Sequence, residues 1–101
     1  MAKYLLSPEA QNSLKQIKNY SNDQFGKQRT RAYLKEIMNR FRDLAENPSL
    51  GTMRSELNSS YRSSFVGSHT IYFRTKSSRI EIIDVLHQSM EPTKHLLEDI
   101  K

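Results

Sequence analysis

Apolar side chains in the first half of the sequence recur with the period of an α-helix. Residues 3–6 are largely apolar and predict a first strand, after which Ser7 and Pro8 suit the N-cap and first turn of a helix. The next apolar positions are spaced three or four residues apart, which places them on one helical face. They are Ala10, Leu14 and Ile17. We expect this helix to fade through residues 21–23.

A second and stronger helical pattern begins near Lys27, after the interruption at Gly26, and stops at Asn47 and Pro48. Its apolar positions again form a single face. They are Leu34, Ile37, Met38, Phe41, Leu44 and Ala45. Because only a few residues separate the two helices, we predict that they fold back on each other as an antiparallel hairpin.

The second half of the sequence changes to the pattern of β-strands. Residues 47–60 are rich in turn-forming side chains and predict a loop, with one turn near residues 54–57. Three segments rich in β-branched and aromatic residues follow, separated by short turns that suit hairpins. They span residues 61–66, 69–75 and 79–87. A short amphipathic segment, 93–100, comes last.

The predicted order of elements, β-α-α-β-β-β-α, indicates an α+β fold in a single domain of residues 1–101. We expect an antiparallel four-stranded sheet covered on one face by the helical hairpin. The other face should be partly open, because no second helical layer remains in the sequence. Exposed strand edges and an uncovered apolar face favour the binding of a partner.

Composition narrows the function classes only slightly. The formal charge of +5 attracts phosphate groups or an acidic protein, so direct nucleic-acid binding stays open. The sequence has no cysteine, which excludes disulfides and thiolate catalysis. It also has neither an apolar run of the roughly 18 residues that span a bilayer nor a signal-like start. We therefore expect a cytoplasmic protein without membrane contact.

Four short motifs, in this order and spacing, resemble the toxins of the RelE/ParE superfamily. They are residues 6–10 (LSPEA), 45–51 (AENPSLG), 67–74 (GSHTIYFR) and 85–92 (VLHQSMEP). The last two are similar to the ParE branch in particular. The resemblance runs from Tyr4 to about Leu97, which is nearly the whole chain.

This resemblance implies a four-stranded, mainly antiparallel sheet under a helical hairpin, and the role of toxin in a type II toxin–antitoxin pair. ParE toxins are associated with plasmid stabilization and with poisoning of DNA gyrase, which blocks replication. The implied partner is an antitoxin of the ParD or PaaA kind, whose disordered C-terminal segment folds on the toxin. No cofactor is implied.

The alternative is a ribosome-dependent mRNA interferase of the RelE kind. A nuclease without metal needs a proton shuttle near neutral pH, which His69 and His87 could supply. It also needs cations around the scissile phosphate. The candidates are Arg62, Arg74 and Arg79.

We favour histidines that pack or cap turns, and hence no catalytic residue. RelE-type nucleases resemble one another in a denser cluster of basic, tyrosine or histidine side chains on the sheet and at the C-terminus, whereas this tail is mixed in charge. It sets Lys94, His95 and Lys101 against Glu91, Glu98 and Asp99. A poison that acts by binding is therefore the favoured function.

One face of the second predicted helix is basic, because Lys27, Arg31 and Lys35 are spaced four residues apart; Arg29 and Arg42 add charge elsewhere on the helix. This face could contact an acidic antitoxin or gyrase-bound DNA, or could simply be solvated. Our candidates for antitoxin binding combine it with the sheet arginines. They are Lys27, Arg31, Leu34, Lys35, Arg62, Arg74 and Arg79.

Two further groups of residues, aromatic and acidic, are weaker candidates for a functional role. Aromatic side chains on a sheet can stack on bases, but core packing is the favoured role here. The residues are Tyr61, Phe65, Tyr72 and Phe73, of which the last two should point to opposite faces. Glu81, Asp84 and Glu91 have no spacing typical of metal ligands, so we expect no metal site.

Overall fold

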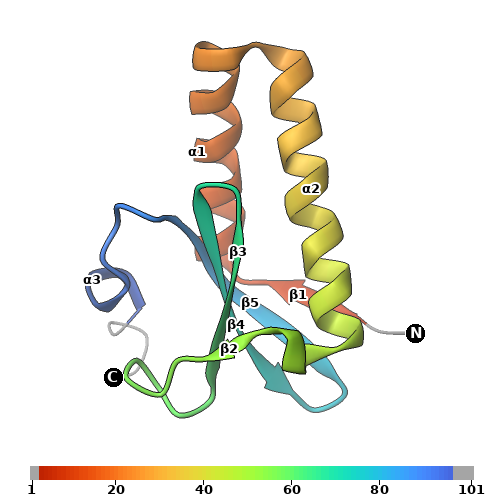
Figure 1. Ribbon diagram of the computed structural model, residues 1–101, viewed down its shortest axis with the longest axis vertical. Coiled ribbons are helices and arrows are strands. Elements are labelled where there is room, and N and C mark those ends of the chain that lie inside the picture. The colour runs from red at the N-terminus through yellow and green to blue at the C-terminus, as the bar shows by residue number, and fades with distance from the viewer. Residues whose placement is uncertain (1–2, 97–101) are drawn as a thin grey trace.

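Two long helices and a five-stranded sheet make up most of residues 3–96, the part of the chain that the computed structural model describes (Figure 1). In chain order the elements are β1 (Tyr4–Leu6), α1 (Pro8–Phe25), α2 (Lys27–Glu46), the 3-10 helix η1 (Pro48–Leu50), β2 (Thr52–Met53), β3 (Tyr61–Val66), β4 (His69–Lys76), β5 (Arg79–His87) and α3 (Pro92–Leu96). The predicted α+β composition is confirmed. The part of the predicted tail beyond Leu96 lies outside the described residues.

The helical hairpin forms as predicted, with one correction. Ser7 caps α1, because its side chain accepts a hydrogen bond from the backbone N–H of Ala10 at 3.0 Å. The expected end of α1 at residues 21–23 is wrong, since the helix continues to Phe25. Ser21 is buried, so packing overrides the weak helix preference of the polar residues around it. Gly26 alone joins the helices at φ +86°, a conformation that glycine adopts without strain.

The sheet differs from the predicted four antiparallel strands in number and direction. Its strand order is β1-β5-β4-β3-β2, and β1 runs parallel to β5 with Tyr4 opposite Ile80. The other pairs are antiparallel. The fifth strand, β2, pairs with the start of β3 and has only two residues, too few for a periodic signal. Side-chain patterns predict that a strand exists, but they do not predict its neighbour or its direction.

The two faces of the sheet carry cores of different size. On the helical face, the main core joins the hairpin to β3, β4 and β5, and its fully buried members include Ile37, Phe41 and Phe73. The outer face was expected to be partly open, but a second cluster covers its centre. That cluster consists of Leu57, Tyr61, Tyr72, Ile83, Leu86 and Leu96, supplied by the sheet, the 54–60 loop and α3. Tyr72 and Phe73 therefore lie on opposite faces, as predicted.

The helical hairpin extends past the end of the strands (Figure 1). Within this overhang Tyr20 and Phe25 are exposed, whereas Thr30 is buried. The β3–β4 turn reaches the hairpin at Gly67, whose φ is +56°. A Cβ atom there would come within 2.6 Å of the Tyr33 ring, so glycine is needed for this close approach. A hollow is left beside this contact.

Candidate functional site

A groove of about 840 Å³ lies between the overhanging part of the hairpin and one end of the sheet. We call it the hairpin groove. Its walls come from α1, from α2 and from the turns and strand ends of the sheet. The lining residues are Ser13, Gln16, Ile17, Tyr20, Ser21, Phe25, Arg29, Ala32, Tyr33, Glu36, Ser68, His69, Val85, His87 and Met90.

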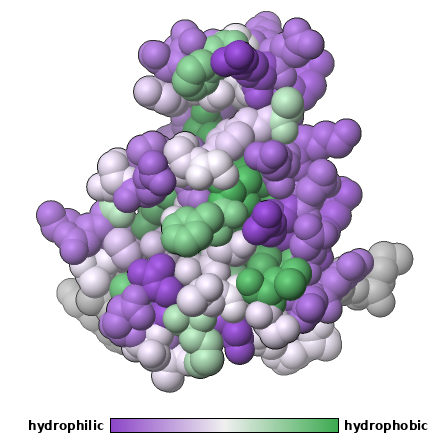
Figure 2. Space-filling view, viewed as in Figure 1, coloured by the Kyte–Doolittle hydropathy of each residue, from purple (hydrophilic) through white to green (hydrophobic). Residues whose placement is uncertain are grey.

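Most of the groove surface is apolar, and part of it is unusually accessible. Tyr20 is 65% exposed and Phe25 is 57% exposed, values expected of polar rather than large aromatic residues. Figure 2 shows a green patch at the end of the hairpin among purple side chains, and separate green patches nearer the sheet. An apolar surface with charged side chains at its rim, here Arg29 and Glu36, is typical of a site for a protein segment.

Tyr33 holds the helices to the strands at the floor of the groove. Its hydroxyl donates to the carbonyl oxygen of Val66 at 3.0 Å and accepts from the N–H of Ser68 at 3.3 Å. It also lies 2.6 Å from Nδ1 of His69. With the hydroxyl proton directed to Val66, Nδ1 of His69 carries the ring proton and donates it to Tyr33. The unprotonated nitrogen of His69 is then Nε2.

His69 and His87 are a pair rather than two separate residues. They are directly opposite on β4 and β5, and their ring centroids are 5.3 Å apart with the planes at 88°. Burial lowers the pKa of His69 below its ordinary value of 6.5, and the adjacent His87 lowers that pKa further. At neutral pH His69 is therefore a neutral ring.

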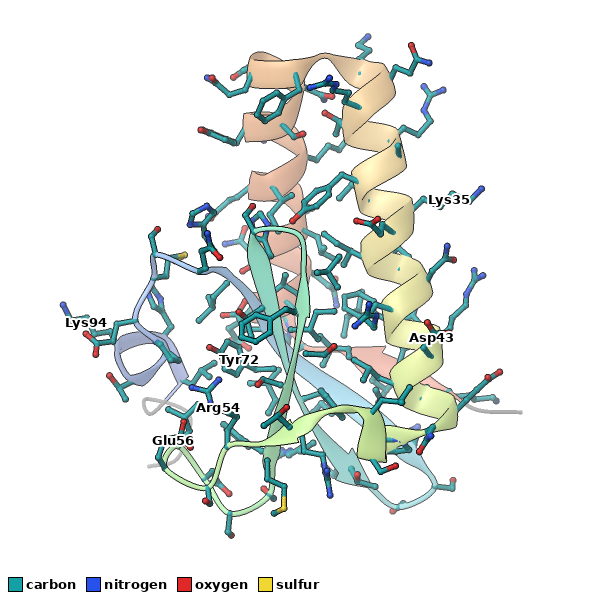
Figure 3. The ribbon with its side chains drawn as sticks, in the orientation of Figure 1. Lys35, Asp43, Arg54, Glu56, Tyr72 and Lys94 are labelled. Atoms are coloured by element: carbon teal, nitrogen blue, oxygen red, sulfur yellow. The ribbon has the colours of Figure 1, made fainter. Side chains whose placement is uncertain are left out.

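The basic face of α2 is solvated and does not line the groove. Lys27, Arg31 and Lys35 are exposed, and Lys35 points away from α1 and the sheet in Figure 3. Leu34, in contrast, is half-buried and packs on the main core, so its side chain already contributes to the fold. The structure thus keeps the three cations on one side of the helix. Arg29 is the helical cation that does line the groove.

The three sheet arginines predicted for phosphate or antitoxin contact do not join the histidines. Arg62 donates to the carbonyl oxygen of Gly51 at 3.1 Å, near β2. Arg74 forms an ion pair with Glu81 at 2.8 Å. Arg79 is exposed at the start of β5, at the turn that follows Lys76. The three sheet arginines therefore have separate surroundings.

The outer face of the sheet holds a separate polar cluster. Arg54 lies over the Tyr72 ring, 5.5 Å from its centroid, and pairs with Glu56 at 2.6 Å (Figure 3). The hydrogen bond that Arg54 donates to the Glu56 carboxylate raises the pKa of Arg54 and lowers that of Glu56. Tyr61 and Tyr72 are buried there, as core packing predicts, but Phe65 is 67% exposed, so the expectation of core packing is wrong for that residue.

Two of the three acidic candidates, Glu81 and Asp84, occupy structural positions, whereas Glu91 is exposed. Burial raises the pKa of Asp84, whose Oδ1 accepts hydrogen bonds from Ser13 at 2.5 Å and from the N–H of Val85 at 2.8 Å. Glu81 is taken by the Arg74 ion pair. Among residues 3–96, no three histidine or acidic side chains gather as a metal site would need. Nor does any helix in that range have the length and apolarity to cross a bilayer.

Sequence reasoning named Arg29, His69 and His87 but missed Tyr33, which also lines the groove, and Arg40, which lies outside the groove lining. Tyr33 and Arg40 follow the polar flank of the α2 pattern, and nothing in that pattern signals a partner on the sheet. Arg40 donates to Oγ of Ser64 at 2.8 Å and to the carbonyl oxygen of Phe65 at 3.3 Å. The one sequence signal for the groove was the placement of two aromatic residues, Tyr20 and Phe25, close to the helix end at Gly26. Both side chains are exposed in the structure, so this end of the hairpin is not buried in a core.

The fold of this chain is similar to that of a solved structure. One chain of the solved structure "Chromosomal ParDE TA system from P. aeruginosa" aligns with a TM-score of 0.74, covering 86% of this chain and 96% of that one. The two sequences are 17% identical, so this likeness shows the fold alone.

Sequence comparison gives the family. The family described as "ParE toxin of type II toxin-antitoxin system, parDE" matches residues 4–92. Toxin ParE1 of Mycobacterium tuberculosis (strain H37Rv) is 35% identical over 96 residues, 94% of this chain and 98% of that protein. Toxin ParE1 of Caulobacter vibrioides is 36% identical over 96 residues, 95% and 99% of the two chains. The chain therefore belongs to the ParE toxin family of the RelE/ParE superfamily, and it is the toxin of a type II toxin–antitoxin system.

Proposed function

We propose that this toxin acts in the cytoplasm by binding DNA gyrase and trapping it, which blocks replication, and that a ParD- or PaaA-like antitoxin neutralises it. Membership of the ParE family supports the gyrase target. A binding mode is further supported by the engagement of the sheet arginines elsewhere: Arg62 with Gly51 and Arg74 with Glu81. A gyrase poison needs a contact surface and no proton transfer.

The hairpin groove carries the proposal for the antitoxin. A disordered C-terminal antitoxin segment that folds on binding can lay the apolar side of a helix in such a groove. The exposed rings of Tyr20 and Phe25 would receive its apolar anchors. Arg29, the helical cation that lines the groove, would receive acidic residues at the edge of that helix. The segment would then continue along the rim of the sheet.

Hydrogen exchange tests this placement. In a complex with the cognate antitoxin, amides of residues 16–36 and of the strand ends around His69 and His87 should exchange more slowly than in the free toxin. Amides of the β4–β5 turn around Arg79 serve as the internal control and should exchange at the same rate. Protection confined to that turn, with none on the hairpin, contradicts the placement.

Expression from a tightly regulated promoter tests the target. Gyrase poisoning predicts induction of the SOS response, filamentous cells and gyrase-dependent DNA cleavage with purified toxin. Rapid arrest of translation with cleaved mRNA, and no SOS response, contradicts the gyrase proposal.

One observation favours the alternative, a RelE-like mRNA interferase. His69 and His87 adjoin each other in a groove that also holds Arg29, so a proton shuttle and a cation line the same space. The double variant His69→Gln/His87→Gln separates the two functions. A nuclease that lost its acid–base groups would slow by about 10²–10⁴-fold and stop killing cells. For the gyrase poison we expect killing and gyrase-dependent cleavage to persist at equal levels of folded protein.

A further inference from the structure

The solvent side of α2 carries a row of four exposed cations. Lys27, Arg31 and Lys35 are spaced four residues apart, and Arg42 continues the row two turns further along the helix. With 3.6 residues per turn and a rise of 1.5 Å per residue, the four positions fall within about 80° of the helix circumference and span about 22 Å along its axis. We call these four residues the basic stripe.

The charge of the basic stripe is not neutralised by the fold. Within residues 3–96, none of its four side chains forms an ion pair or a hydrogen bond. The one acidic residue between Lys27 and Arg42 in the sequence is Glu36, which lines the hairpin groove on another side of the helix. Asp43 and Glu46 follow only beyond the end of the stripe. The stripe therefore presents a continuous line of positive charge to solvent.

The position of the basic stripe makes it accessible to a large partner. The hairpin extends past the end of the strands (Figure 1), and Lys27 and Arg31 precede Tyr33, where the β3–β4 turn meets the hairpin. Lys35 points away from α1 and the sheet in Figure 3, and Figure 2 shows hydrophilic side chains along that side of the molecule. A long ligand can therefore approach α2 from this side.

The chemistry of the basic stripe favours a nucleic acid duplex over a protein. Protein interfaces have apolar and aromatic anchors at their centre, and none of the exposed large apolar side chains of residues 3–96 belongs to α2. Single-stranded nucleic acid is held largely by stacking on aromatic rings, which the stripe lacks. Duplex DNA has one phosphate per 3.4 Å of axis on each strand, so a row of about 22 Å faces about six phosphates of one strand.

We propose that the basic stripe binds the phosphate backbone of double-stranded DNA without reading its sequence. Contacts from lysine and arginine to phosphates position a protein on the duplex and carry no sequence information. DNA is favoured over duplex RNA because the major groove of B-form DNA admits an α-helix, whereas that of A-form RNA is too narrow. The stripe does not line the hairpin groove, so DNA and the proposed antitoxin segment occupy different sides of α2.

Salt dependence tests the proposal on the free full-length toxin. Fluorescence anisotropy of short labelled duplexes of unrelated sequence should give the same Kd for each, about 10⁻⁴–10⁻⁶ M near physiological salt. Each neutralised phosphate contributes about −0.9 to the slope of log K against log[NaCl], so the four cations predict a slope of about −3.6. Between about 50 and 200 mM NaCl the affinity should therefore fall about 10²-fold.

A charge-matched pair of variants locates the binding site. Lys27→Gln/Arg31→Gln/Lys35→Gln should reduce the slope by about three, one for each lost phosphate contact, and weaken binding in low salt by at least about tenfold. The matched control removes two exposed lysines and one exposed arginine from the β4–β5 turn and α3, and it should keep the slope of the parent. It is Lys76→Gln/Arg79→Gln/Lys94→Gln. Lys94 and Lys35 lie on opposite sides of the molecule in Figure 3.

Four results would overturn the proposal, and the first depends on no variant's folding. The parent may not bind duplex DNA in low salt, or may bind it with a slope near zero. Equal losses in both triple variants would show that net charge, not the basic stripe, determines binding. Tighter binding of single-stranded DNA or duplex RNA would show that the ligand is wrong. A stripe variant that keeps DNA binding but loses antitoxin affinity would assign the stripe to an acidic protein. The DNA titrations contain neither gyrase nor antitoxin, so their outcome is independent of the proposed function.

Discussion

The two halves of the helical hairpin share one amphipathic pattern but have different surroundings. Beside the strands, Ile37, Phe41 and Leu44 are fully buried in the main core. Beyond the end of the strands, Tyr20 and Phe25 are more than half exposed on the wall of the hairpin groove. An apolar stripe therefore specifies which side of a helix avoids water, but not what covers it. The sheet covers one half, and a partner can cover the other.

The largest effect is expected in the packed half. Phe41→Ala removes a fully buried ring that also packs against the Tyr4 ring, 5.2 Å between centroids. We expect a loss of about 3–5 kcal/mol in the free energy of unfolding, out of a total of about 5–15 kcal/mol. Denaturant or thermal unfolding measures it. Asp43→Ala, an exposed position on the same helix, should change stability by less than about 0.5 kcal/mol. A Phe41→Ala transition within a few degrees of the parent contradicts this assignment.

A truncation in the cluster on the outer face of the sheet should destabilise the protein less than Phe41→Ala does. Leu57 is 5% exposed in the second cluster and belongs to the 54–60 loop, which can move partly into the space left by truncation. Leu57→Ala should therefore destabilise by about 2 kcal/mol, the low end for buried leucines. The same unfolding experiment applies. A loss as large as that of Phe41→Ala would show that the two faces contribute equally.

In the overhanging half of the helical hairpin, a substitution should weaken antitoxin binding without affecting folding. Phe25→Ser removes a ring that is 57% exposed, so stability should shift by no more than about 0.5 kcal/mol. Affinity for the antitoxin should fall about tenfold, or 1.4 kcal/mol, because an apolar anchor is lost. Leu50→Ser is the matched control, 59% exposed on η1 and outside the groove. Equal loss of affinity in both variants would argue against the groove.

The smallest expected effect is on the pH dependence of the free energy of unfolding. The folded-state pKa of His69 lies below the ordinary 6.5, chiefly because of burial, so the unfolded chain binds more protons there. The free energy of unfolding should therefore fall as the pH drops from above 6.5 through the folded pKa. His69→Gln should flatten that slope, and His95→Gln should not. Asp84 has a raised pKa and the opposite sign, but it is present in both proteins and cancels in the comparison. An unchanged slope in His69→Gln would contradict the assignment.

Periodicity was enough to predict the elements and most of the core. The stripe through Ile37 and Phe41 is buried, and Tyr72 and Phe73 divide between the two faces as strand alternation requires. These features depend on local spacing along the chain. The direction of β1 and the existence of β2 depend on which strands pair with each other. Local spacing along the chain carries no information on that pairing.

The candidate site was less predictable for the same reason. His69 and His87 were recognised as chemically capable residues, but their contact follows from the β4–β5 register. The exposure of Phe65 depends on where the outer cluster ends. The sheet arginines were grouped by charge alone, whereas Arg62 and Arg74 have separate partners. Whether any of the seven predicted positions contacts an antitoxin stays a prediction.

The parallel pairing of β1 with β5 has a consequence for the order of folding. The N-terminal strand is fixed by residues near the other end of the chain: the N–H of Ser7 donates to the carbonyl oxygen of Ile82 at 3.0 Å, and its hydroxyl donates to that of Ile83 at 2.6 Å. Closing so long a loop is entropically unfavourable and slow compared with forming the local helical and β-hairpins. On the ribosome, the sheet can be completed only after β5 has emerged, so a nascent toxin lacks its full fold until that strand has been made.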